Sequence, residues 1–324
     1  MFRRGRRLRD TAIIRDLVRE NELSVKDFIL PIFVVEGENI KREISSLKGN
    51  YHWSVDRLGE LVKELKETGV RSVIIFGVPE HKDCKGTEAY NENGIVQKAI
   101  RKLRELDDEL YIITDVCMCE YTNHGHCGIL HGKSIDNDET LEYLGKIALS
   151  HAKAGAHMIA PSDMMDGRIG YIRKVLDDNG FKMTPIMSYA AKYASGFYGP
   201  FREAAGSAPQ FGDRKGYQMD PANSREAMLE IEADINEGAD IIMVKPAMSY
   251  LDIVREARNR YDVPLCVYNV SGEYAMVKNA GEAGLIDEKR VALEMLMSMK
   301  RAGAKMIMTY YAIEAARWLK EDSN

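Results

Sequence analysis

Apolar residues gather in eight short segments along the chain, each about the length of a β-strand. Most of these segments are nearly continuous in hydrophobicity, and this pattern is typical of strands buried on both faces of a parallel sheet. The segments are 28–35, 72–79, 110–117, 156–163, 184–192, 239–246, 264–271 and 304–311. We therefore predict eight buried, parallel strands.

The stretches between these segments carry apolar residues at helical spacing. Within 55–68, for example, one helical face holds Leu58, Leu61, Val62 and Leu65. A glycine follows several of the predicted helices and comes directly before the next strand, where it is suited to end the helix. The chain therefore alternates between predicted strands and predicted helices.

This alternation favours an α/β fold of the (β/α)₈ type, the TIM barrel. A doubly wound open sheet is the alternative, but no glycine-rich phosphate loop follows the first strand, which disfavours its dinucleotide-binding form. Residues 1–27 are expected to form an extended N-terminal arm, and residues 28–324 a single catalytic barrel domain. Because such arms often pack on a neighbouring subunit, we expect a homo-oligomer.

Composition and charge exclude several classes of protein. Hydrophobic residues make up 45% and charged residues 29%, which argues against disorder and against a disulfide-rich miniature fold. The net charge is −5, so no general attraction to nucleic acid is implied. The longest apolar run is well short of the roughly 20 residues that cross a bilayer. We expect neither nucleic acid nor a membrane as a partner.

Three of the five cysteines, Cys117, Cys119 and Cys127, lie within eleven positions. The odd count and an Arg-rich start without an apolar secretion segment favour reduced thiols and a cytoplasmic protein. Cys117 and Cys119 share one face of an extended segment, and the loop after them can return Cys127 to the same ion. Three thiolates suit Zn²⁺, with either an open catalytic position or His124 or His126 as a fourth, structural ligand. Their place at the end of the third strand favours the catalytic alternative.

A lysine closes each of two neighbouring strands, Lys192 after the fifth and Lys245 after the sixth. Adjacent strands lie about 4.8 Å apart, so two ammonium groups there would disfavour each other's charge, as would partial burial. At least one amine is then neutral near pH 7, and a neutral lysine can form a Schiff base with a ketone or aldehyde. The alternative is two surface lysines whose charged ends remain in water.

The long segment 195–218 between the fifth and sixth strands has the length of a lid. Its arginines, Arg202 and Arg214, suit a carboxylate clamp, and a solvated surface loop is the alternative. Other polar residues, Asp115, Ser162 and Ser271, stand at further strand ends, where this fold places its chemistry.

Seven stretches carry a close resemblance to one family. They are 115–119, 125–128, 160–168, 192–202, 212–215, 243–246 and 268–274, with the sequences DVCMC, GHCG, APSDMMDGR, KYASGFYGPFR, GDRK, MVKP and YNVSGEY. In these stretches the sequence resembles the porphobilinogen synthases, also called 5-aminolevulinate dehydratases, and the resemblance extends over nearly the whole chain. It implies a lyase that condenses two 5-aminolevulinate molecules into porphobilinogen, with loss of two waters, in the biosynthesis of haem and other tetrapyrroles.

The resemblance also implies roles for individual residues. Lys245 would hold one substrate as a Schiff base, and Lys192 would be the second active-site lysine. Asp115 and Ser162 would assist proton transfer. All three cysteines are kept, so the chain is similar to the zinc-dependent members.

Two carboxylate sites are implied as well, with Ser271 and Tyr310 binding the substrate on the Schiff-base lysine. The other substrate would be bound by the two lid arginines, with Gln218 nearby. Glu230 stands where some members bind a stimulatory Mg²⁺, although a glutamate on a helix surface is usually only solvated. The family is typically octameric, with the arm embracing a neighbouring subunit.

Two other functions remain alternatives. A class I aldolase-like barrel would need one Schiff-base lysine and no zinc, and the second lysine and the cysteine cluster count against it. A zinc-storage or nucleic-acid-binding protein would use the basic segment 1–9, and its binding to nucleic acid would weaken steeply with salt.

Overall fold

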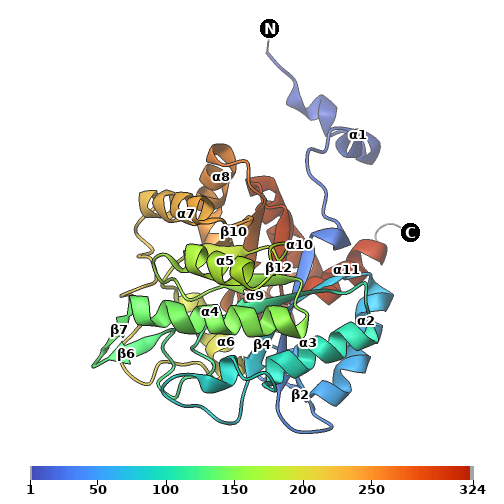
Figure 1. The fold of residues 1–324 in the computed structure, drawn as a ribbon. Helices are drawn as coiled ribbons and strands as arrows, with labels where there is room; N and C mark the ends of the chain where they lie inside the picture. Colours follow the sequence, from blue (N-terminus) through green and yellow to red (C-terminus); the bar gives the residue numbers. More distant parts are fainter. Residues whose placement is uncertain (1, 322–324) are drawn as a thin grey trace.

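In a computed structural model, which describes residues 2–321, the eight expected strands form a parallel barrel at the centre of the molecule (Figure 1). They are β1 (Phe28–Val35), β4 (Ser72–Val78), β5 (Tyr111–Val116), β8 (Met158–Pro161), β9 (Met187–Lys192), β10 (Ile241–Lys245), β11 (Leu265–Asn269) and β12 (Met306–Thr309).

The strands are paired in the order β8-β5-β4-β1-β12-β11-β10-β9. A parallel bridge between Ile159 and Ile186 connects the two ends of this series, so the sheet closes on itself. All eight residues of β1 are buried, as expected for a strand covered on both faces. The prediction of a TIM barrel is confirmed, and the open-sheet alternative is wrong.

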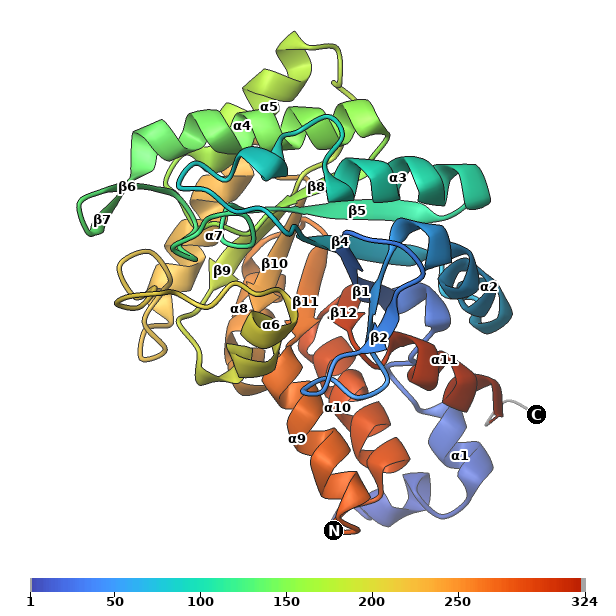
Figure 2. The same ribbon diagram turned by 90° about the horizontal axis from the view of Figure 1, so that it is seen from below.

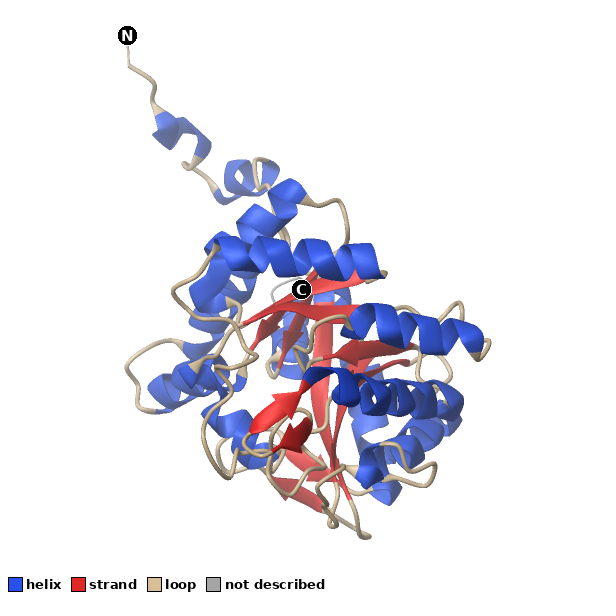
Figure 3. Cartoon of the chain, turned by 60° about the vertical axis from the view of Figure 1, so that its left-hand side comes forward, coloured by secondary structure: helices blue, strands red, loops and turns tan. Residues whose placement is uncertain are grey.

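Helices surround the barrel on its outside (Figure 3). They are α2 (Leu58–Thr68), α3 (Ile95–Leu106), α4 (Asn137–Ala154), α5 (Arg168–Asp178), α7 (Arg225–Glu237), α8 (Leu251–Arg260), α9 (Ser271–Glu282), α10 (Glu288–Ala302) and α11 (Ala312–Glu321). The expected apolar face of α2 is buried. Gly69 ends this helix with φ of 82°, a left-handed conformation that favours glycine.

Several short elements were not predicted. A three-residue antiparallel pair joins β2 (Lys41–Glu43) to β3 (Tyr51–Trp53), and a hairpin joins β6 (Ile129–His131) to β7 (Ser134–Asp136). The hairpin projects from the barrel beside α4 (Figure 2). Short 3₁₀ turns within the barrel domain include η3 (Val55–Arg57), η4 (Thr87–Ala89) and η6 (Met248–Tyr250). These elements are too short to show a hydrophobic period in the sequence.

The N-terminal segment extends away from the barrel (Figure 1). It contains η1 (Gly5–Leu8), α1 (Ala12–Leu17) and η2 (Val25–Asp27). Ile13 and Leu17 in α1 are 73% and 75% exposed, so the helix leaves apolar side chains uncovered in a single chain. Met1 and residues 322–324, which belong to the predicted arm and barrel domain, lie outside the described residues. Among residues 2–321, no helix combines the length and the apolar character needed to span a membrane.

A buried ion pair connects α5 to α7 beside β9. The guanidinium of Arg168 is 2% exposed and donates to both carboxylate oxygens of Asp234, at 3.0 and 3.1 Å. It also donates to the Ser188 hydroxyl at 3.0 Å, and Asp163 lies 3.7 Å from Nε. Such a pair is costly to break because the remaining charge would stay buried.

Candidate active site and cysteine cluster

The two predicted lysines lie side by side. The parallel register of β9 and β10 places Lys192 directly opposite Lys245, and both residues are almost fully buried. The Lys192 ammonium donates to the carbonyl of Ser162, at the end of β8. The alternative of two surface lysines whose charged ends remain in water is therefore wrong.

Aromatic rings surround the Lys245 amine. Its Nζ lies between 4.4 and 5.2 Å from four ring centroids, those of Tyr268, Phe201, Tyr189 and Tyr198. Burial among these rings, together with the charge of Lys192, lowers the pKa of Lys245 to about 7. A substantial fraction of this amine is therefore neutral and nucleophilic at physiological pH.

Six of the expected residues and one cysteine line a single narrow cavity. They are Asp115, Cys119, Ser162, Lys192, Arg202, Arg214 and Lys245. The walls also include Phe76 and Glu120. The residues come from the ends of β5, β8, β9 and β10 and from the lid, so the barrel topology brings together groups that are far apart in the sequence.

Asp115 occupies the floor of this cavity at the end of β5. Burial, together with the charge of Glu120, raises the pKa of its carboxyl to about 8, although both lysines oppose the shift. Its Oδ1 is buried and has no hydrogen-bond partner among the described residues. The Ser162 side chain lies close enough to this carboxyl to favour its charged form slightly. The pair therefore offers a site where a proton can be held next to the lysines.

The three clustered cysteines meet at the edge of the cavity. All three are buried, and their sulfur atoms lie within 4.8 Å of one another. Cys117 Sγ and Cys119 Sγ are 3.4 Å apart, and burial raises the pKa of the Cys117 thiol. Three sulfur donors at this spacing fit a Zn²⁺ ion, which binds thiolates at about 2.3 Å in a tetrahedral arrangement.

Neither histidine of the cysteine loop belongs to the group of close ligand atoms, although His124 Nε2 is buried and has no hydrogen-bond partner among the described residues. Both ring nitrogens of His126 have other partners, the Tyr217 hydroxyl at 3.2 Å and the Phe211 carbonyl at 3.0 Å. His124 Nδ1 accepts from the His126 backbone at 3.1 Å. Within residues 2–321, the group of ligand atoms at this place consists of the three cysteines alone. A closed site with a histidine as fourth ligand is therefore not supported.

The segment between β9 and β10 forms a lid over the cavity. Its first part contains η5 (Gly196–Tyr198) and α6 (Gly199–Ala204), and the rest is irregular. Arg202 is half-buried, whereas Arg214 is 5% exposed and donates to the Gly125 carbonyl at 2.9 Å and to the Ser207 carbonyl. Both arginines line the cavity, whereas Gly212, Asp213, Lys215 and Gly216 are exposed, so the lid is buried at Arg214 and solvated around it.

Ser271 holds the first part of the lid. Its hydroxyl accepts from Phe201 N at 3.0 Å and donates to Phe197 O at 3.2 Å. Tyr310 lies deeper, where its hydroxyl is 2.8 Å from that of Tyr268, a ring that packs against the Lys245 amine. Both residues therefore lie on the Lys245 side of the site, but outside the wall of the enclosed cavity.

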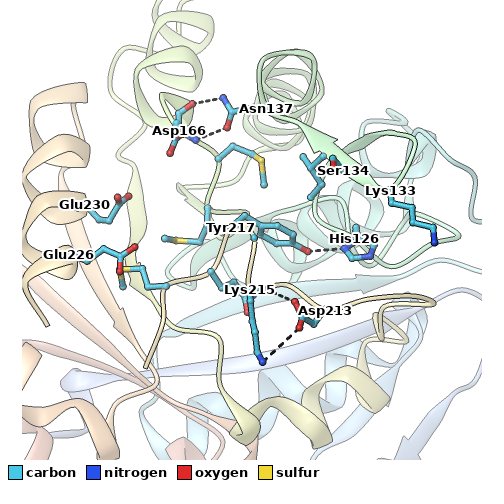
Figure 4. A pocket seen from close by; sticks show the side chains of 16 residues that line it. His126, Lys133, Ser134, Asn137, Asp166, Asp213, Lys215, Tyr217, Glu226 and Glu230 are labelled. Carbon is cyan, nitrogen blue, oxygen red and sulfur yellow. Dashed lines mark hydrogen bonds and ion pairs between the residues drawn. The ribbon is translucent and has the colours of Figure 1, made fainter. Parts of the chain in front are cut away.

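Gln218 and Glu230 face a second, more open pocket with an empty volume of about 1180 Å³ (Figure 4). Gln218 is 3% exposed, and neither end of its amide has a partner among the described residues. Glu230 lies beside Glu226 on one side of the pocket. Burial and nearby carboxylates raise the pKa of Glu230. These two predicted residues are thus separated from the lysine cavity.

Sequence reasoning missed some residues of the site. Glu120 is 3% exposed, lines the cavity and accepts from Cys119 Sγ at 3.2 Å. Tyr189 and Tyr268 form part of the aromatic surroundings of Lys245. The position of Glu120 directly after the second cysteine was the available signal, and the two tyrosines stand at inward positions of predicted strands.

Comparisons with known sequences indicate one family. The sequence model described as Delta-aminolevulinic acid dehydratase matches residues 2–318. The enzyme of that name from Bacillus subtilis is 55% identical over 320 residues, covering 99% of each chain. Its namesake from Staphylococcus aureus is 53% identical over 320 residues, covering 98% of this chain and 99% of that one.

One solved structure has nearly the same fold as this chain. Delta-aminolevulinic acid dehydratase (porphobilinogen synthase) from Toxoplasma gondii, in complex with the reaction product porphobilinogen, superimposes with a TM-score of 0.97 at 43% identity. The match covers 99% of this chain and 93% of that one. The resemblance seen in the sequence motifs therefore extends to the entire fold.

Proposed function

The chain belongs to the delta-aminolevulinic acid dehydratase family, and we propose that its cavity condenses two 5-aminolevulinate molecules into porphobilinogen through a Schiff base on Lys245. Two waters are lost, so the enzyme is a hydro-lyase of tetrapyrrole and haem biosynthesis. The observation that carries this proposal is a buried lysine with a pKa of about 7, enclosed with a second lysine, a cysteine cluster and two arginines.

Lys245 supplies the nucleophile. Its neutral amine attacks the ketone carbon of one substrate, and a C–N bond forms. The amine gives up its two protons, the carbonyl oxygen leaves as water, and an imine remains. The aromatic rings around Nζ keep bulk water away from this imine and thereby slow its hydrolysis.

Proton transfers fall to the groups beside Lys245. Asp115 and Ser162 line the same cavity, so they can pass a proton to or from the reacting carbon and oxygen atoms. Lys192, held by the Ser162 carbonyl, keeps a donor at the mouth of the barrel. Its charge also helps to keep Lys245 neutral.

Each substrate brings one carboxylate. Arg202 and Arg214 on the lid bind that of the second substrate, because guanidinium groups match a carboxylate in charge and shape. The hydroxyls of Ser271 and Tyr310 bind that of the substrate on Lys245. In this structure the Ser271 hydroxyl makes two hydrogen bonds to the lid backbone. When the substrate binds, these are replaced by a hydrogen bond to its carboxylate. Gln218 is proposed to serve the second substrate from the neighbouring pocket.

The three cysteines hold a catalytic zinc ion. When bound, zinc supplies a Lewis acid and a positive charge at the edge of the cavity. Cys119 lines the cavity itself, whereas Cys117 and Cys127 lie behind it, so the open side of the cluster faces the substrates. This arrangement distinguishes the site from that of a class I aldolase-like barrel, which needs one lysine and no metal.

Glu230 is proposed as a ligand for a stimulatory Mg²⁺. Within residues 2–321, its carboxylate is not part of a group of three close metal-ligand atoms, so a single chain does not complete such a site. A partner subunit would have to add ligands. We propose that residues 1–27 form an arm that embraces this partner, that residues 28–324 form the catalytic domain, and that the protein is a cytoplasmic homo-octamer.

The proposal is tested by pyrrole formation. The purified protein is supplied with 5-aminolevulinate, with and without a metal chelator, and Lys245→Met is assayed in parallel. We expect porphobilinogen from the untreated enzyme and none from the chelated enzyme or the variant. Pyrrole formation by Lys245→Met at the wild-type rate would disprove the proposed nucleophile.

A further inference from the structure

The second half of the lid, residues 207–218, rests on the cysteine loop, residues 124–127. Gln210 N donates to the His124 carbonyl at 3.0 Å, and the Arg214 guanidinium donates to the Gly125 carbonyl at 2.9 Å. The backbones of the lid and the cysteine loop approach so closely that a Cβ added at Gly125 would lie 2.3 Å from the Ala208 carbonyl oxygen. The contact between lid and loop is therefore direct and tightly packed.

His126 makes two more contacts across this junction. A carbonyl oxygen can only accept, so His126 Nε2, 3.0 Å from Phe211 O, must carry the proton. In the neutral imidazole, Nδ1 is then an acceptor, and it accepts from the Tyr217 hydroxyl at 3.2 Å. The ring also packs against that of Phe211, with centroids 4.7 Å apart. Figure 4 shows the bond between His126 and Tyr217 on the wall of the open pocket.

Phe211 and Tyr217 flank Arg214 in the sequence, three residues before it and three residues after it. One imidazole therefore holds both sides of the segment that carries Arg214. The structure assigns neither helix nor strand to residues 205–218, and the lid's own bonds at Arg214 are local ones, such as that from Gln218 N to the Arg214 carbonyl at 2.9 Å. The position of the arginine consequently depends on contacts with the cysteine loop.

We propose that His126 is a positioning residue that latches the second half of the lid to the cysteine loop and so holds Arg214 over the cavity. This inference rests on the proposed function, in which Arg214 binds the carboxylate of the second substrate. His126 acts through the lid, and both of its nitrogens are occupied by lid groups. The proposal therefore assigns it a role other than binding metal.

Two variants and one matched control test the latch. His126→Phe keeps a ring of similar size but removes both hydrogen bonds, and Tyr217→Phe removes one. Tyr261→Phe is the control, because it deletes a tyrosine hydroxyl bond to Met228 O of 2.8 Å in another part of the barrel. Hydrogen exchange of a peptide covering residues 207–218 measures lid opening directly and needs no activity.

We expect lid exchange to be roughly tenfold faster or more in His126→Phe and a few-fold faster in Tyr217→Phe, as the loss of two and one hydrogen bonds implies. Tyr261→Phe should leave lid exchange unchanged. The substrate concentration for half-maximal pyrrole formation should rise more than kcat falls. Borohydride trapping of the first substrate on Lys245 should persist, because that site does not depend on Arg214.

The metal content of the variant distinguishes a positioning role of His126 from a role as a metal ligand. At saturating zinc, His126→Phe should bind one ion per chain, and with Co²⁺ in its place the visible absorption spectrum should match that of the wild type. Unchanged lid exchange in His126→Phe, or a lost ion or altered cobalt spectrum, would overturn the proposal. If His126→Phe fails to fold by circular dichroism, Tyr217→Phe decides by the same exchange measurement. A wild-type protein that made no pyrrole would refute the proposed function, whereas the exchange comparison would still decide the latch.

Discussion

Removing the charge of Lys192 should raise the pKa of Lys245. Both Nζ atoms lie over the ring of Tyr189, 5.7 and 5.1 Å from its centroid, so they are at most about 10.8 Å apart. At that distance and an effective dielectric constant of about 20, two unit charges repel by ~1.5 kcal/mol or more. This energy corresponds to about one pKa unit. In Lys192→Gln, the pKa of Lys245 should therefore rise from about 7 to about 8 or higher.

The assay is the initial rate of borohydride-trapped adduct formation between pH 5.5 and 10. Levulinate serves as the ketone, because it lacks the amino group of the substrate and does not titrate in this range. With a pKa of about 7, about a tenth of Lys245 is neutral at pH 6 and about nine tenths at pH 8. The wild-type rate should thus rise about tenfold over those two units and then level off.

The midpoint of this curve, and not its height, carries the result. Lys192→Gln should move the midpoint to higher pH by about one unit, even if the variant reacts more slowly at every pH. Lys174→Gln, a fully exposed lysine on α5, is the matched control and should leave the midpoint in place. A wild-type rate that kept rising to pH 10, or a midpoint that moved down in Lys192→Gln, would refute the electrostatic account of Lys245.

Three further results are expected. Replacing Cys117, Cys119 and Cys127 together by alanine should abolish pyrrole formation and zinc binding while far-UV circular dichroism stays native, because a barrel of this size does not need a metal to fold. The control Cys84→Ala, at an exposed cysteine, should keep pyrrole formation and zinc binding. Loss of the native spectrum on chelation would indicate a structural site. Arg214→Ala should still form the Lys245 adduct but bind the second substrate about ten- to a hundredfold more weakly, because roughly 1.5–3 kcal/mol of charge-assisted bonding is lost. The control Lys215→Ala, at the exposed neighbouring residue, should bind the second substrate normally. If Arg214→Ala lost adduct formation but kept normal affinity for the second substrate, the assignment of the two carboxylate sites would be reversed. Arg168→Met should lower the free energy of unfolding by about 3–5 kcal/mol, because Asp234 would remain buried without its partner. Urea unfolding measures this, with Lys174→Met as the exposed control. Equal unfolding midpoints for Arg168→Met and the wild type would contradict the stated burial cost.

Much of the barrel was predictable because buried parallel strands leave a strong signal. The continuous apolar segments correspond to the eight barrel strands, and the lysines that close two of them are direct neighbours. The cysteine cluster was predictable as well, because residues two apart on an extended chain share a face. In each case the deciding contacts are local in sequence or follow from adjacent strands.

The remaining features depend on contacts between distant segments. The two bonds of His126 reach residues 85 and 91 positions away, so no local pattern distinguished this histidine from a metal ligand. Gln218 was expected near the lid arginines from the family resemblance, yet it faces a separate pocket from the lysines, which Glu230 of α7 also lines. The short strand β3 pairs with β1 and β2, and β2 pairs with β3, so both depend on these pairings rather than on a hydrophobic pattern of their own.

The account depends most on Lys245 as the residue that becomes covalently bound to substrate. The direct measurement is peptide mapping by mass spectrometry after borohydride reduction of the zinc-loaded enzyme with 5-aminolevulinate. We predict one reduced adduct per chain, on the peptide that contains Lys245, because this amine combines burial, aromatic surroundings and a pKa of about 7. An adduct found only on Lys192 or elsewhere, in an enzyme that makes porphobilinogen, would contradict the account.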